Sequence, residues 1–196
     1  MSAFLGPIHY WLYNKIQLQE KLTAHIAQMA VNNKWIAGDI YSKVDERPFD
    51  KLIDESNIHG WLQTRISDAE TRYAELVTRL LGDDSTNIET LKQAAFSFGK
   101  GYSIPQNAGA DEALQSFTDS FVNGMPCDHV NNFIVTEADN AEWEESIDVH
   151  AGYWTAAGGD PDNYYILRGE VMRGMLNGSG LAFEETSPKH YRIYRK

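Results

Sequence analysis

Histidine, tryptophan and glutamate recur at the same spacing in two stretches of the chain that begin fifty positions apart. Residues 8–26 read IHYWLYNKIQLQEKLTAHI, and residues 58–76 read IHGWLQTRISDAETRYAEL. A supersecondary unit that is used twice usually packs against its copy, so equivalent side chains can meet. Imidazole and carboxylate groups are common metal ligands, so the repeat predicts a site. The residues that recur are Ile8, His9, Trp11, Leu12, Ile16 and Glu20, as Ile58, His59, Trp61, Leu62, Ile66 and Glu70, with Lys15 matched by Arg65.

Helix geometry limits how the repeated side chains can combine. His9 and Glu20 are eleven residues apart, so on a helix they share a face but are separated by roughly 16 Å. Antiparallel copies would therefore form two separate His–Glu pairs, whereas parallel copies would place His9 beside His59. The connector over residues 34–57 is longer than the roughly 2–8 residues that join antiparallel neighbours in bundles. We therefore expect parallel copies.

Both repeated histidines fall in the first turn of their expected helices. The positive end of a helix disfavours imidazolium there, and neutral imidazole is the form that binds metal. Trp11 and Trp61 would keep such a site dry. The alternative interpretation is that a duplicated helix keeps its packing residues, while the repeated glutamates are solvated or pair with lysine and arginine.

A second candidate is the run Cys127-Asp128-His129, which follows Gly124-Met125-Pro126 in an expected turn. A thiolate and an imidazole separated by one residue can reach the same iron, zinc or copper ion. Cys127 could instead be a nucleophile with His129 as its base. A lone cysteine can also be a small buried apolar residue.

A third candidate is His150, on a helix expected over Asp139–Trp154. There it would share a face with Trp143, Ile147 and Trp154. A histidine on an aromatic stripe is most often a core residue whose ring nitrogens are hydrogen-bonded. It becomes a candidate ligand because other histidines and Cys127 are available.

The helix expected over Asp162–Leu176 carries aromatic and basic side chains that could line a pocket for an anionic ligand. We favour the simpler interpretation that these side chains lie on a half-exposed amphipathic face. They are Tyr164, Tyr165, Arg168 and Arg173.

The elements that must position these groups are mainly helical. Apolar spacing predicts helices at 8–31, 58–81, 87–98, 111–122, 139–154 and 162–176, with short ones at about 35–44 and 48–55. Leu181–Glu185 and Tyr191–Tyr194 predict a small C-terminal β-hairpin. No polar linker divides the chain. We expect one mainly α domain over residues 1–196, a helical bundle with an internal helix repeat, whose halves are 1–82 and 83–196.

Composition excludes several classes of partner. The net charge of −11 argues against nucleic acid, and no apolar stretch is long enough to cross a membrane. The first residues lack the basic and apolar regions of a signal peptide. The single cysteine excludes an intrachain disulfide. These features predict a cytoplasmic protein without a nucleic-acid or membrane partner.

Two of the stretches above also carry a resemblance. GPIHYWLYNKI at 6–16 and GMPCDHVN at 124–131 together resemble uncharacterised prokaryotic proteins to which no activity is attached. The resemblance implies that His9 and Cys127-Asp128-His129 belong to one set.

The leading hypothesis is a protein that binds a transition metal (iron or zinc) or haem. If it is an enzyme, the metal would carry out redox or hydrolytic chemistry on a small molecule. One alternative is a structural module without a cofactor, such as a homodimer. The other is a metal-free enzyme with Cys127 as nucleophile. The expected ligands are His9, His59, Cys127, His129 and His150, with Glu20 and Glu70 as carboxylate partners and Trp11, Trp61 and Trp154 as the cofactor shell.

Overall fold

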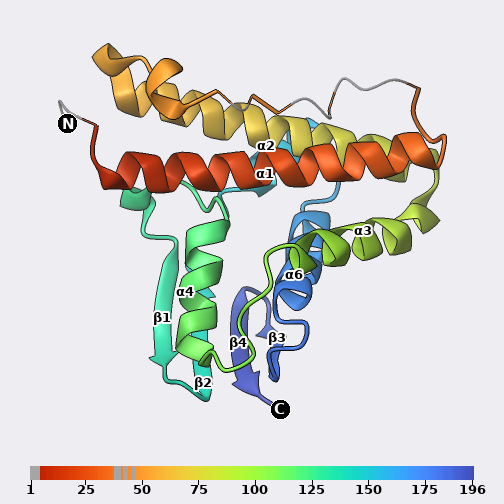
Figure 1. The fold of residues 1–196 in the computed structure, drawn as a ribbon. Helices are drawn as coiled ribbons and strands as arrows, with labels where there is room; N and C mark the ends of the chain where they lie inside the picture. Colours follow the sequence, from red (N-terminus) through yellow and green to blue (C-terminus); the bar gives the residue numbers. More distant parts are fainter. Residues whose placement is uncertain (1–4, 38–40, 42–43, 46) are drawn as a thin grey trace.

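Two long helices lie side by side and run in the same direction across one end of the molecule (Figure 1). The computed structural model describes residues 5–37, 41, 44–45 and 47–196. The helices are α1 (Pro7–Asn32) and α2 (Ile58–Asp83), and they contain the two copies of the repeat. The ring centroids of His9 and His59, both in first turns, are 5.6 Å apart. The parallel arrangement expected from the connector length is confirmed.

Local signals begin both long helices. Pro7 is the first residue of α1, where a missing N–H loses no helical hydrogen bond. The side chain of Asn57 caps α2 by accepting a hydrogen bond from the N–H of Gly60 (3.2 Å). Between the helices, two 3₁₀ turns, η1 (Phe49–Lys51) and η2 (Glu55–Asn57), replace the helix expected over 48–55. The short helix expected over 35–44 lies partly outside the described residues.

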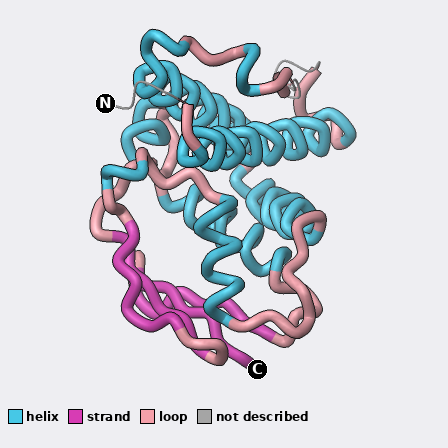
Figure 2. Tube along the Cα trace, turned by 60° about the vertical axis from the view of Figure 1, so that its left-hand side comes forward, coloured by secondary structure: helices cyan, strands magenta, loops and turns pink. Residues whose placement is uncertain are grey.

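The second half of the chain combines short helices with a four-stranded sheet. The helices are α3 (Ile88–Lys100), α4 (Ala110–Ser120), α5 (Ala151–Ala156) and α6 (Asp162–Met175), with 3₁₀ turns η3 (Ser85–Asn87) and η4 (Pro126–Asp128). The strands are β1 (Asn131–Thr136), β2 (Asn140–Glu145), β3 (Leu181–Ser187) and β4 (His190–Arg195). They pair antiparallel in the order β1-β2-β4-β3. The sheet and the α1–α2 pair lie at opposite ends of the molecule, with the shorter helices between them (Figure 2).

The helix expected over 139–154 is wrong for residues 139–150, and only residues 151–154 are helical, at the start of α5. Ala141, Trp143 and Glu145 are buried and alternate with half-buried residues, which is the two-residue period of a strand. Trp143 lies opposite Tyr191 of β4 in the sheet register. The predicted terminal hairpin, β3–β4, is therefore half of a larger sheet.

Close helix packing and a shared core connect the two halves. α3 and α6 cross at Gly99 and Gly174, where an added Cβ would collide with the backbone carbonyls of Val171 and Phe96. Apolar side chains of α1, α2, α3, α5, α6 and the sheet form one buried cluster. The mainly α class is confirmed. None of the described helices is both long and apolar enough to cross a bilayer.

Candidate functional site

The repeated histidines meet, but His9 has a capping role. Its Nδ1 accepts a hydrogen bond from the backbone N–H of Gly6 (2.9 Å), which secures the first turn of α1. In a neutral ring the proton must then lie on Nε2. A metal ion needs a free nitrogen lone pair, and this hydrogen bond occupies the one that neutral His9 has. The half-buried His59 ring is tilted against His9.

The repeated glutamates have different surroundings. Glu20 Oε2 lies 3.0 Å from Nη1 of Arg72, beside a surface pocket of 550 Å³. Burial raises the pKa of Glu20, and the Arg72 charge partly offsets that effect. Glu70 is 1% exposed, and its Oε2 lies 3.2 Å from His150 Nδ1. The repeat therefore does not form a symmetric site, because Glu70 alone contacts a histidine.

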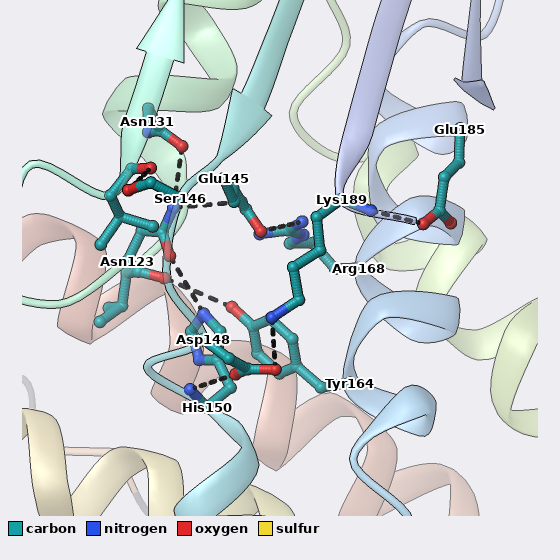
Figure 3. A network of polar contacts seen from close by, with 12 residues as sticks. Asn123, Asn131, Glu145, Ser146, Asp148, His150, Tyr164, Arg168, Glu185 and Lys189 are labelled. Atoms are coloured by element: carbon teal, nitrogen blue, oxygen red, sulfur yellow. Dashed lines mark hydrogen bonds and ion pairs between the residues drawn. The ribbon is translucent and has the colours of Figure 1, made fainter. Parts of the chain in front are cut away.

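A chain of polar side chains runs from Glu70 through the core to Arg168 on α6. His150 Nε2 lies 3.2 Å from the side-chain oxygen of Asn123, and the Asn123 amide donates to Glu145 (3.1 Å). Arg168 donates two hydrogen bonds to the Glu145 carboxylate, at 2.6 and 3.1 Å. Figure 3 shows Asn123 and Arg168 on either side of Glu145. The network joins α2, α6, β2 and the segments that precede β1 and α5.

The loop that carries His150 is held from several sides. The imidazole is stacked on the Tyr164 ring, with centroids 3.6 Å apart. The Asp148 carboxylate accepts hydrogen bonds from the backbone N–H groups of His150 and Ala151 and from Lys189 Nζ. Burial alone would raise the pKa of Asp148, but these hydrogen bonds bring it below its ordinary range. The position of the imidazole is thus set before any ligand arrives.

Arg168 supplies a fixed positive charge at the far end of the network. Burial disfavours its cation, but the attraction of Glu145 is stronger, and the pKa of Arg168 lies above its ordinary value. The guanidinium also lies 5.0–5.5 Å from the ring centroids of Tyr164, Tyr165 and Tyr191. The half-exposed face expected here is wrong for Arg168 and Tyr164, which are 4% and 2% exposed.

The hydrogen bonds of Asn123 determine where the protons of His150 lie. The Glu145 carboxyl oxygens accept hydrogen bonds from Arg168, and Asn123 likewise turns its NH₂ group to Glu145 and its oxygen to His150. Nε2 of His150 must then carry a hydrogen. Its Nδ1 faces Glu70, so either the ring is protonated beside a carboxylate or it is neutral beside a carboxylic acid. In both states the pair holds one transferable proton.

Glu70 and His150 also form part of the wall of a cavity of 230 Å³ between α2, α5 and the segment around η4. Glu70 Oε1 is buried and has no hydrogen-bond partner in the described part of the chain. A buried carboxylate oxygen without a partner is costly, so a hydrogen-bond donor bound beside Glu70 would be favoured. The other wall residues are Gln63, Ile66, Val122, Gly124, Asp128, Val149 and Tyr153.

The Cys127-Asp128-His129 run faces solvent. All three residues are exposed, and His129 has a left-handed backbone, with φ of 48°. The Asp128 carboxylate closes the turn by accepting the N–H of Met125 (2.7 Å). Among the described residues, no hydrogen bond joins Cys127 to His129. The interpretation of Cys127 as a buried apolar residue is wrong, and its nucleophilic role stays a prediction.

The three predicted shell tryptophans lie in different places. Trp11 donates its indole N–H to Asp119 of α4 (2.7 Å) and lines a cavity near η4. Trp61 lines the surface pocket beside Glu20. Trp154 is buried in the core, edge-on to Tyr73. They do not form one shell.

The predicted ligands meet only in part. The structure brings His9 to His59 and Glu70 to His150, places Glu20 beside Arg72, and leaves Cys127 and His129 on an exposed turn. Within the residues that the structure describes, no three His, Cys, Asp or Glu side chains are arranged as they would be around a metal ion.

Comparison with known proteins adds no assignment. No family model, no curated protein and no solved structure matches the chain. The function must therefore be argued from the geometry of the site.

Sequence reasoning does not single out Asn123 or Glu145. For Glu145 a signal exists, because the alternation at Ala141, Trp143 and Glu145 places its carboxylate on the buried face of a strand, where it needs a partner. Asn123 has no such signal. Its role depends on contacts with residues on β2 and before α5.

Proposed function

We propose that the cavity beside Glu70 binds a small molecule and that the Glu70–His150 pair transfers a proton to or from it as a general acid–base catalyst. The observation that carries this proposal is the buried Oε1 of Glu70, which has no partner in the described chain while Oε2 faces His150. General acid–base catalysis needs a transferable proton within hydrogen-bond reach of the substrate. The hydrogen bonds of Asn123 support one such proton in the pair.

The walls of the cavity favour a particular class of substrate. Its 230 Å³ is smaller than the roughly 300–1,000 Å³ of pockets for drug-sized ligands. Glu70 and Asp128 are two carboxylates in the wall, and Gln63 and Tyr153 add neutral polar groups. We therefore propose a small substrate that presents N–H donors, with a cationic group such as an amine or amidine preferred.

Binding of acetamidine, with acetamide and acetate as neutral and anionic analogues, tests the site. We expect titration calorimetry and ligand-observed NMR to detect acetamidine and not acetate. Glu70→Gln should weaken acetamidine binding by about tenfold or more, because a hydrogen bond to a charged group contributes about 1.5–3 kcal/mol. Glu20→Gln is the matched control and should bind normally. Equal binding by the E70Q and wild-type proteins would contradict the proposal.

The location of the proton has its own test. We expect ¹⁵N NMR of the His150 ring, assigned with the H150Q variant, to show a hydrogen on Nε2 throughout the neutral pH range. In Glu70→Gln the ring should become neutral with Nδ1 unprotonated, because glutamine carries neither the negative charge that stabilises an imidazolium nor an acidic proton, and its NH₂ group can donate to Nδ1. A wild-type ring with an unprotonated Nε2 would rule out the proposed arrangement.

The metal hypothesis stays a prediction, and one observation favours a narrower form of it. Asp128 lies in the same cavity wall as Glu70 and His150, and carboxylate and imidazole donors suit zinc or iron. Calorimetric titration with zinc sulfate and anaerobic ferrous sulfate, and visible spectra with haemin, test it. Tight binding that is lost in both Glu70→Gln and His150→Gln would support a metal at this cavity. Binding unaffected by both changes would refute it.

A further inference from the structure

Lys15 is a buried lysine that the Glu70–His150 site does not use. It is 5% exposed, and its Nζ lies 3.9 Å from the centroid of the Trp11 ring. The edge of the same indole donates to Asp119 (2.7 Å). In the described part of the chain, Lys15 has no ion pair and no hydrogen bond of its own. The aromatic face is thus its main support, which is unusual for a buried ammonium group.

Lys15 lines a second cavity, of 170 Å³, bounded by the start of α1, the end of α4, η4 and the start of β1. Polar groups in its wall include Thr118, Asn123, His129 and Asn131. Within the described part of the chain, the titratable groups that face the amine include Asp119, which accepts from the edge of the indole, and His129, in the wall. The space is large enough for a small molecule, and an amine lies at its edge.

Burial shifts Lys15 toward the neutral amine, although the ammonium form still predominates at pH 7. Burial lowers the pKa of Lys15 to about 8, and the charge of Asp119 only partly opposes this effect. At pH 7 the neutral fraction is then about 300-fold greater than that of an ordinary lysine with a pKa of 10.5. Neutral amine is the form that attacks carbonyl groups, and desolvation is one way in which proteins activate a lysine.

We propose that Lys15 is a reactive amine that forms a Schiff base with a small aldehyde or ketone in this cavity. Nζ attacks the carbonyl carbon and forms a C–N bond. The resulting carbinolamine then loses water, which takes away the carbonyl oxygen and both hydrogens of the amine, so no oxidant or reductant is consumed. The side-chain NH₂ group of Asn131, which donates no hydrogen bond within the described part of the chain, lies in the cavity wall and can stabilise the negative charge that develops on the carbonyl oxygen.

The Glu70–His150 pair lines a different cavity, although Gly124 lies in the walls of both and Asn123, which contacts His150, also lines the Lys15 cavity. The proposal does not depend on proton transfer by that pair. Glu70→Gln should therefore leave the reactivity of Lys15 unchanged, and the two proposals can fail independently.

Reductive trapping in the wild-type protein tests the proposal. Glyoxylate and propionaldehyde are each incubated with the folded protein and sodium cyanoborohydride, and modified lysines are located by peptide mass mapping. Lys21, which is exposed on the same helix, is the internal control. We expect Lys15 to react about tenfold faster than Lys21 at pH 7. Its rate should level off above pH 8, while the rate at Lys21 continues to rise.

Two further measurements connect the reactivity to the fold. In guanidinium chloride the two lysines should react at equal rates, and Lys15→Arg should remove only the fast reaction. Slower or equal modification of Lys15 in the folded protein would overturn the proposal. Protection of Lys15 by acetate without fast modification would also overturn it and would identify an anion site instead.

Discussion

The two copies of the repeat have matching residues in contrasting surroundings. Lys15 of the first copy is buried, whereas its counterpart Arg65 is exposed. For the glutamates the pattern is reversed, since Glu20 is only partly buried beside Arg72, whereas Glu70 is fully buried against His150. The cause is a third element in each case: α4 packs against α1, and α5 packs against α2. A duplicated helix therefore supplies equivalent positions, and the neighbour that covers each position decides its chemistry.

The largest effect should come from the network that only the second copy joins. Arg168→Met leaves the Glu145 carboxylate buried without its cation, and should lower the free energy of unfolding by about 3–5 kcal/mol in urea denaturation. Arg72→Met, at the Glu20 pair, is the matched control and should cost less than about 1 kcal/mol. Similar losses of unfolding free energy in Arg168→Met and Arg72→Met would contradict the contrast between the two copies of the repeat.

The pH dependence of stability should distinguish Lys15 from Arg65. The folded-state pKa of Lys15 is about 8 against an ordinary 10.5, so the unfolded chain binds more protons between these pH values. Over that window the free energy of unfolding of the wild-type protein should rise relative to Lys15→Met, by about 3 kcal/mol. Arg65→Met should show no such trend. A difference between wild type and K15M that does not change with pH would argue against a depressed pKa.

Truncating the two glutamates sharpens the comparison directly. Glu70→Ala leaves Nδ1 of the buried His150 without its partner and should cost about 1–3 kcal/mol of stability. Glu20→Ala removes a less buried ion pair beside the surface pocket, and should cost less than Glu70→Ala, about 1 kcal/mol. Thermal and urea unfolding of both variants provide the measurement. A larger loss of unfolding free energy in Glu20→Ala than in Glu70→Ala would contradict the contrast between the two glutamates.

The smallest expected difference lies between the two histidines. His9→Ala removes the acceptor for the Gly6 N–H at the start of α1 and should cost about 1 kcal/mol, as loss of a helix cap does. His59→Ala should cost less, because Asn57 caps α2. Hydrogen exchange of the first-turn amides of each helix would locate the effect. Equal exchange in the two variants would show that His9 does not act as a cap.

Much of the fold could be predicted, because its signals are local. The apolar spacing of α1, α2 and α6 repeats every few residues, and Pro7 and Asn57 mark where two of these helices begin. The direction of the second copy followed from the length of its connector. The sheet was predicted only in part: the β1–β2 hairpin was missed although its strands are adjacent in the chain, and β2 also pairs with β4, about fifty residues further along. Pairing over such a distance has no local signature.

The candidate site, like the fold, was predictable from the sequence only in part. The amino-acid sequence alone determined that His9 and His59, Glu20 and Glu70, and Lys15 and Arg65 occupy equivalent places on two parallel helices, because helical periodicity and connector length depend only on nearby residues. The tertiary structure decided which member of each pair is buried, and it brought Glu70 to a histidine 80 residues away. The physical reason is that burial and hydrogen-bond partners depend on α4, α5 and the sheet. The distinct environments of Glu70 and Lys15 arise when these elements pack against the repeat.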